Sequence, residues 1–205
     1  YDWEQTLDTD KGFMQSECQF DDVNIGTRAY VHFDFDLLSV KKTFDRTADY
    51  SFVYKLKGAD GKKIERLCYT AEKIENGLVV SYEIDGKEMY HGKIYVFCDA
   101  DVSAECRNDE ITLSKRFENG ESASMFVLYC DDFDRADYTD FLSEKHSEIL
   151  ENPEKVFEKS ARKWADYMSI SDVSLGDKKI CGVYKTAQYH LKTLSTKWSL
   201  PMGIN

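Results

Sequence analysis

Apolar and polar residues alternate along much of the first two thirds of the chain. Every second residue from Arg28 to Leu37 is apolar, and this period of two predicts one half-buried β-strand. The same alternation returns in Ser51 to Lys57. The turn-forming segment Gly58 to Gly61 then leads into Ile64 to Thr70, so we expect these two runs to pair as a hairpin.

Further apolar runs are separated by turn dipeptides. Asn76-Gly77 and Asp85-Gly86 flank the run Leu78 to Ile84, and Ile94 to Cys98 comes next. Asn-Gly and Asp-Gly supply the positive backbone angles that tight hairpin turns require. An antiparallel meander is therefore expected in this region.

Two more apolar runs, Ile111 to Phe117 and Ser122 to Cys130, are joined by four residues that include Asn119-Gly120. This junction predicts another hairpin. Many short strands separated by frequent turns favour an antiparallel β-sandwich over parallel βαβ units. The expected fold class is therefore mainly β, with an antiparallel β-sandwich followed by a linker helix and the first helix of an α/α barrel.

A helical period replaces the alternation after the acidic stretch Asp131 to Asp137, and Tyr138 to Leu150 is expected to be a helix. Asn152-Pro153 marks the start of a second helix, because Asn caps free amides and Pro at the first position loses no needed donor. This helix is expected to end near Met168. Its apolar face contains Val156, Phe157, Ser160, Ala161, Trp164, Tyr167 and Met168.

Asp177 is expected to cap a third helix with an apolar stripe that runs close to the C-terminus. The stripe consists of Ile180, Val183, Tyr184, Ala187, Leu191 and Leu194. It predicts the beginning of an interrupted second domain, although the helix could instead cover a face of the sandwich. We expect a sandwich domain at 1–134, a helical linker at 135–176 and the start of a helical domain at 177–205. An uncovered stripe of this size also leads us to expect self-association through this C-terminal helix.

Composition narrows the classes of partner. The net charge of −11 makes nucleic acid an unexpected partner, because an acidic surface repels phosphate, whereas a neutral sugar is unaffected. No apolar run approaches the roughly 20 residues that span a bilayer, so no membrane partner is expected. The six cysteines lack C-x-x-C spacing and are expected to be mostly buried free thiols. This cysteine usage favours a cytoplasmic location, with a periplasmic or secreted one as the alternative.

Candidate chemistry is sparse. His32, Asp34 and Asp36 could ligate a metal, but we interpret them as the solvated face of a strand. The cluster from Asp131 to Asp137 lacks the calcium-loop pattern and is interpreted as a solvated turn that caps the following helix. No nucleophile-elbow, phosphate-loop, dinucleotide or zinc-protease motif occurs in the sequence. We therefore predict no catalytic residue, no metal ligand and no cofactor within this chain.

Several C-terminal segments carry a family resemblance. They are Ala161-Arg162-Lys163-Trp164-Ala165-Asp166-Tyr167, Ser171-Asp172-Val173, Tyr184-Lys185-Thr186-Ala187-Gln188-Tyr189-His190-Leu191 and Leu200-Pro201-Met202-Gly203-Ile204-Asn205. Together they resemble the passage from the N-terminal β-sandwich to the (α/α)6 barrel in six-hairpin glycosidases. That superfamily includes glucoamylase-like enzymes, trehalose- or maltose-phosphorylase-like enzymes and rhamnosidase-like enzymes.

The resemblance implies that the general acid and its partner carboxylate would lie in later barrel loops, beyond Asn205. It also implies that Trp198 and Asn205, in the loop after the first barrel helix, are the candidate sugar contacts. The expected function is then the non-catalytic N-terminal region of a glycoside hydrolase or related phosphorylase, with carbohydrate as the partner of the full-length protein. The alternatives are a free-standing carbohydrate-binding sandwich and a structural or protein-interaction domain.

Overall fold

The computed structural model describes residues 3–58, 60–85, 89–171, 173–174 and 176–195. The first four strands are β1 (Trp3–Asp8), β2 (Phe13–Phe20), β3 (Val23–Val31) and β4 (Leu37–Phe44). The next four are β5 (Ala48–Lys55), β6 (Leu67–Ile74), β7 (Gly77–Asp85) and β8 (Met89–Cys98). The last three are β9 (Ser103–Arg107), β10 (Glu110–Phe117) and β11 (Ser122–Asp131), and the helices are α1 (Tyr138–Glu151), α2 (Pro153–Ser169) and α3 (Lys178–Leu194).

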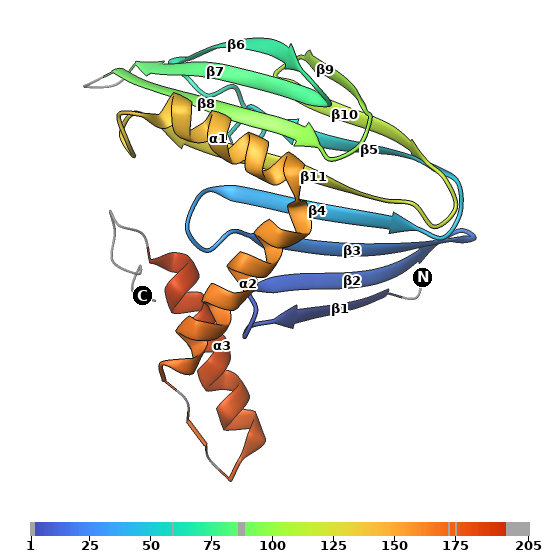
Figure 1. The fold of residues 1–205 in the computed structure, drawn as a ribbon, viewed down its shortest axis with the longest axis vertical. Coiled ribbons are helices and arrows are strands. Elements are labelled where there is room, and N and C mark those ends of the chain that lie inside the picture. Colours follow the sequence, from blue (N-terminus) through green and yellow to red (C-terminus); the bar gives the residue numbers. More distant parts are fainter. Residues whose placement is uncertain (1–2, 59, 86–88, 172, 175, 196–205) are drawn as a thin grey trace.

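The strands form two antiparallel sheets, which confirms the predicted mainly β sandwich (Figure 1). The large sheet has eight strands in the order β1-β2-β3-β4-β11-β8-β7-β6, and the small sheet has three in the order β5-β10-β9. The small sheet packs on one face of the large sheet, and α1 and α2 lie on the other face. The molecule is therefore layered as small sheet, large sheet and helices.

β11 lies in the middle of the large sheet and shows why these layers form. Its alternate residues Ala123, Met125 and Val127 face the small sheet, while Phe126 and Leu128 face α1. All five side chains are buried. A strand that is apolar on both faces must be covered on both sides, so β11 fixes the three-layer arrangement.

The helices begin where local signals predicted. The Asn152 side chain accepts a hydrogen bond of 2.9 Å from the Lys155 N–H at the start of α2, and Pro153 occupies its first position. Asp177 caps α3 in the same way through the Lys179 N–H, at 2.8 Å. The predicted helices, and the prediction that Asn152 and Asp177 cap them, are thereby confirmed.

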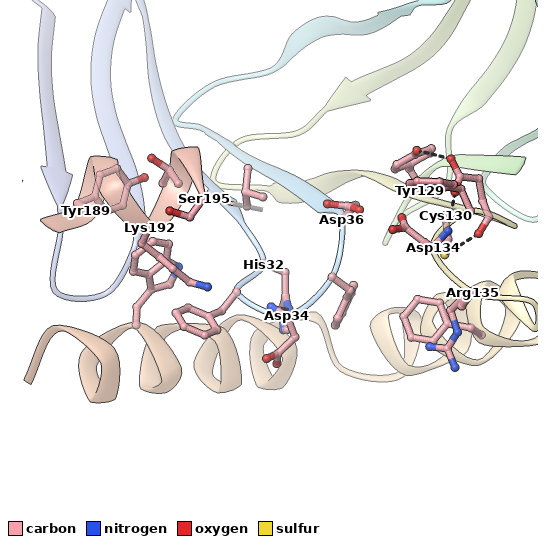
Figure 2. A pocket seen from close by; sticks show the side chains of 18 residues that line it. His32, Asp34, Asp36, Tyr129, Cys130, Asp134, Arg135, Tyr189, Lys192 and Ser195 are labelled. Atoms are coloured by element: carbon pink, nitrogen blue, oxygen red, sulfur yellow. Dashed lines mark hydrogen bonds between the residues drawn. The ribbon is translucent and has the colours of Figure 1, made fainter. Parts of the chain in front are cut away.

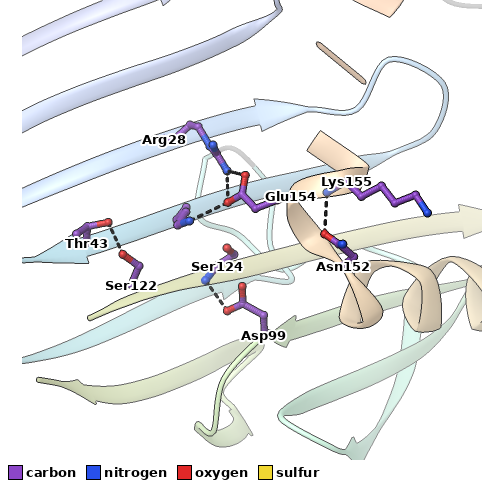
Figure 3. A network of polar contacts seen from close by, with 9 residues as sticks. Arg28, Thr43, Asp99, Ser122, Ser124, Asn152, Glu154 and Lys155 are labelled. Atoms are coloured by element: carbon purple, nitrogen blue, oxygen red, sulfur yellow. Dashed lines mark hydrogen bonds and ion pairs between the residues drawn. The ribbon is translucent and has the colours of Figure 1, made fainter. Parts of the chain in front are cut away.

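Glu154, in the first turn of α2, attaches the helix to the sheet (Figure 3). Its carboxylate accepts hydrogen bonds from Arg28 of β3 at 2.8 Å and from Lys41 of β4 at 2.7 Å. Burial alone would raise the pKa of Glu154, but the hydrogen bonds from Lys41 and Arg28 hold this pKa below its ordinary value. The guanidinium of Arg28 also lies 4.0 Å from the centre of the Phe157 ring. These contacts orient α2 across the strands.

The prediction of one strand from Arg28 to Leu37 is wrong. β3 ends at Val31, β4 begins at Leu37, and the chain turns back between them, with the His32 N–H donating to the Leu37 carbonyl at 2.9 Å. The alternation continues through the turn because Phe33 and Phe35 pack on the helices, against Trp164 and Phe141. Because the helices cover alternate side chains of this turn, its sequence shows the same period of two as a strand.

Two predicted hairpins are also wrong. β5 pairs with β10 in the small sheet, whereas β6 pairs with β7 in the large sheet, so the segments around Gly58 and Gly61 connect two layers. In the same way β10 belongs to the small sheet and β11 to the large sheet. Turn residues show that the chain reverses direction, but they do not determine which strand becomes the partner.

All six cysteines are free, but only Cys98 and Cys130 are fully buried, and Cys68 is exposed. The expectation that most are buried is therefore wrong.

Within the described part of the chain, no helix combines the length and the apolar character needed to cross a membrane.

Candidate functional site

A cavity of about 920 Å³ lies where the helices meet one end of the large sheet. Its walls come from the connection between β3 and β4 at residues 32–36, the connection between β11 and α1 at residues 132–137, and side chains of α2 and α3 (Figure 2). Because it combines aromatic side chains with convergent polar groups, we take it as the candidate functional site.

His32 forms part of the floor and is buried. Its ring stacks on Phe35 with 3.9 Å between ring centres, and its Nδ1 accepts a hydrogen bond of 3.2 Å from the Asp34 N–H. Burial lowers the pKa of His32 to about 4. The imidazole is therefore neutral at pH 7, and the predicted role of His32 in a solvated strand face is wrong.

The connection that carries His32 is attached to α2 at two points. The Phe33 N–H donates to the Ser160 hydroxyl at 3.1 Å, and Lys163 forms an ion pair with Asp34 at 2.6 Å. Ser160 is buried, which explains why a polar residue stands on the apolar face of α2. The cavity floor is thus held in place by the neighbouring helix.

Aromatic rings form the wall between α2 and α3. Trp164 contacts Phe33 at 5.2 Å and Tyr189 at 5.0 Å between ring centres. The Lys192 ammonium lies 4.4 Å from the centre of the Phe33 ring, a favourable cation–π geometry. Tyr189 and Lys192 were not predicted as site residues, because their positions on a helix do not show which neighbour they will contact.

The opposite wall contains hydrogen-bonded polar groups. The Tyr129 hydroxyl donates to Asp131 at 2.7 Å, and the other carboxylate oxygen of Asp131 accepts from the Asp134 N–H at 3.0 Å. Burial, together with the hydrogen bond to Asp131 and the nearby Tyr82, raises the pKa of Tyr129 above its usual range. Burial also raises the pKa of Cys130 to about 11, so this residue is a thiol at pH 7 and not a nucleophilic thiolate.

This arrangement suits binding better than acid–base catalysis. Aromatic faces and hydroxyl groups can stack on and hydrogen-bond a neutral polyhydroxy ligand. Asp34 and Asp131 are both held by structural contacts, to Lys163 and Tyr129 respectively. No group of three His, Cys, Asp or Glu side chains in the described ranges is arranged to hold a metal ion.

The predicted sugar contacts, Trp198 and Asn205, lie outside the described residues. The nearest described position is Ser195, which lines the cavity directly after the end of α3. The expectation that the acidic stretch caps the following helix is wrong, because Asp137, the residue before α1, makes no capping hydrogen bond with its side chain. Its carboxylate instead binds Arg135, at 2.6 Å from Nε.

The apolar stripe of α3 is largely exposed. The exposed fractions are 53% for Ile180, 70% for Val183, 53% for Leu191 and 56% for Leu194. None of the residues of α3 is fully buried. The helix runs back along α2 (Figure 1), and this stripe does not cover a face of the sandwich.

Comparisons with known proteins show similarity in structure only. No family model and no curated protein sequence matches the chain. A solved structure described as "Putative kojibiose phosphorylase from human microbiome" matches 94% of this chain with a TM-score of 0.68 and 12% sequence identity. The chain spans 28% of the length of that protein. At this identity the similarity establishes the fold alone.

Proposed function

We propose that this chain is the non-catalytic N-terminal region of a carbohydrate-active enzyme, a glycoside hydrolase or a related phosphorylase. In this proposal the sandwich, α1 and α2 support a helical catalytic domain that begins with α3. Carbohydrate is the partner of the full-length protein. The catalytic carboxylates belong to the helical domain.

The exposed stripe of α3 is the observation that carries the proposal. A helix with an apolar face normally buries it, and its burial contributes roughly 25 cal/mol per Å² of apolar surface. Leu191 and Leu194 project from a helix that is already capped and that is attached to α2 through the contact of Tyr189 with Trp164. Further helices packed against this stripe would complete a helical domain.

The similarity to a phosphorylase structure supports the same proposal. It covers almost all of this chain but little more than a quarter of the other protein. A shared fold of this extent is expected when a sandwich of this kind is one part of a larger enzyme. The assignment to carbohydrate chemistry rests on this likeness and on the C-terminal resemblance together.

The cavity supplies the position for a sugar. It is lined by Ser195, which directly follows α3 and precedes Trp198 and Asn205 in the sequence. We propose that these two residues contact sugar in the full-length protein and that Phe33 and Trp164 hold the surface from which their segment departs.

The test compares the 205-residue chain with the polypeptide encoded by the continuing reading frame. That frame is expected to encode further helical hairpins with acidic loops. The extended polypeptide should cleave disaccharides with water or with inorganic phosphate, while the 205-residue chain turns over neither disaccharides nor aryl glycosides.

A free-standing carbohydrate-binding sandwich makes a different prediction. Calorimetry would then show that the 205-residue chain binds oligosaccharides as tightly as the extended polypeptide does. A reading frame that stops after Asn205 would contradict our proposal. Catalysis by the 205-residue chain that is abolished by one carboxylate substitution would also contradict it.

A further inference from the structure

The face of β1 to β4 that lies on the same side as the small sheet is apolar but largely uncovered. Pairing places Leu7, Met14, Ala29 and Val40 in one row that continues into buried Met125 of β11. The core between the sheets thus extends outward along this row. Its outer side chains are exposed: the exposed fraction is 64% for Trp3, 44% for Leu7, 57% for Phe20 and 58% for Val31.

Charged residues are almost absent from this face, which we call the β1–β4 face. Its strand positions are Trp3, Gln5, Leu7, Met14, Ser16, Cys18, Phe20, Val23, Ile25, Thr27, Ala29, Val31, Leu38, Val40, Lys42 and Phe44. Lys42 is the one charged residue among them, in a chain of which 32% is charged. Its ammonium donates to the Thr27 hydroxyl at 2.7 Å. Such depletion of charge is typical of the centre of an interface.

Two strand edges adjoin this face. β1 is the last strand of the large sheet, and β5 is the last strand of the small sheet. β5 lies above β4, since the Tyr50 ring contacts Phe44 with 5.7 Å between ring centres, and β9, at the other end of the small sheet, contacts β7. The unpaired edge of β5 therefore faces the space above β3. Unpaired edges of this kind readily accept another strand.

We propose that a second copy of this chain covers the β1–β4 face through a two-fold axis, with β1 of each copy pairing beside β5 of the other. In this arrangement β2 lies over β2 of the second copy, and β1 lies over β3. Each large sheet of eight strands is then continued by the three strands of the other copy's small sheet. A single symmetry operation covers both apolar faces and pairs both free edges.

A second copy fits this surface because each copy offers both halves of the contact, as a two-fold interface requires. Strands of about eight residues are about 27 Å long, so three of them present roughly 400 Å² of projected area. Exposed apolar patches of this size on soluble proteins commonly mark interaction sites. With two such faces and two edge pairings, the buried area comes close to the lower limit of about 1,200 Å² for specific interfaces.

The proposed interface is independent of the proposed function. The β1–β4 face lies on the opposite side of the large sheet from α1 and α2, and Val31, at the end of β3, is the one residue of this face that also lines the cavity. The other positions of the face can therefore be altered without changing the cavity. The net charge of −11 acts against association, so added salt should strengthen the dimer by screening the repulsion between copies.

Sedimentation of the 205-residue chain over a range of concentrations tests the proposal. The wild type should dimerise, and Leu7→Glu should raise the dissociation constant by about tenfold or more, because it places a carboxylate in an apolar contact. Thr6→Glu is the matched control, since Thr6 is exposed on the opposite face of β1. Circular dichroism and the urea midpoint should show that both β1 variants are folded.

Hydrogen exchange gives a second measurement. Amides of β1 and β5 should exchange more slowly as the concentration rises in the wild type but not in Leu7→Glu. A wild type that stays monomeric at several hundred micromolar would overturn the proposal. So would an association that survives Leu7→Glu or that is lost only in Val183→Glu, on the stripe of α3.

Discussion

The indole of Trp164 occupies the space that a side chain at position 12 would fill. A Cβ atom at Gly12 would lie 2.2 Å from Cδ1 and Nε1 of Trp164. Gly12 also has a φ of 68°, which L-residues rarely adopt. The glycine between β1 and β2 thus permits α2 to approach the sheet through its largest side chain.

Gly12→Ala should lower the free energy of unfolding by about 2–4 kcal/mol, the sum of the cost of a positive φ and of overpacking. Gly120→Ala is the matched control, because Gly120 has a φ of 76° but no atom within 4 Å of its added Cβ. That variant should lose only about 1 kcal/mol. Urea unfolding measures both changes, and equal losses would show that Trp164 does not limit the space at Gly12.

Trp164→Ala should lower the free energy of unfolding by about 3–5 kcal/mol, because a large buried ring is replaced by a void. Trp164 is only 5% exposed and contacts Phe33, Tyr167 and Tyr189. Trp164→Phe should lose less, since it keeps part of this packing. Subtracting the fluorescence spectrum of Trp164→Phe from that of the wild type should leave a blue-shifted emission. A water-like difference spectrum with an unchanged urea midpoint would show that α2 is not docked.

Local sequence signals were sufficient to predict where the helices begin. Asn152 and Asp177 cap helices through hydrogen bonds to residues two or three positions later in the chain, so the sequence contains the whole interaction. The strands required more information, because the partner of β5 is β10, more than fifty positions away. Periodicity identifies that a segment is a strand, but pairing depends on which apolar faces the completed layers can cover.

The candidate site could not be predicted for a related reason. His32 was interpreted as solvated because its neighbours alternate, yet it is buried by Phe35 and by the helices that the turn contacts. Tyr189 and Lys192 enter the cavity wall only because α3 runs back along α2. These contacts join residues far apart in the sequence, and the spacing of residue types does not encode them.

The buried imidazole of His32 should make folding sensitive to mild acid. Its pKa is about 4 in the folded protein and about 6.5 in an unfolded chain, so the unfolded state binds more protons between these values. The contribution of His32 to the free energy of unfolding is fully present above pH 6.5 and is lost as the pH falls towards 4. Desolvation is the main cause of the shift, and the nearby charges of Asp34, Lys163, Glu148 and Lys145 modify it.

Between pH 6.5 and pH 4 the free energy of unfolding of the wild type should therefore fall more than that of His32→Phe. The difference between the two decreases should be up to about 3 kcal/mol. His190→Gln serves as the control, because His190 is exposed on α3. Urea midpoints measured at half-unit pH intervals provide the comparison. Parallel curves for the wild type and His32→Phe would show that His32 is accessible to protons in the folded state.

The exposed stripe of α3 gives the sharpest test of the proposed helical domain. Leu191→Asp should change the stability of the 205-residue chain by no more than about 0.5 kcal/mol, because Leu191 is 53% exposed and a surface substitution costs little. In a polypeptide extended by further helices, the same substitution should cost several kcal/mol, since it buries a carboxylate without a partner.

Thr186→Asp is the matched control for Leu191→Asp. It introduces the same charge five residues earlier, at an exposed position on the side of α3 away from the stripe and outside the cavity, and should be almost neutral in both polypeptides. Urea unfolding of the four variant proteins gives the comparison, and sedimentation of the shorter pair reports any self-association through α3. An equally small cost of Leu191→Asp in both contexts would mean that no helix packs on the stripe, because a buried aspartate cannot be inserted into an apolar contact without a large loss of stability.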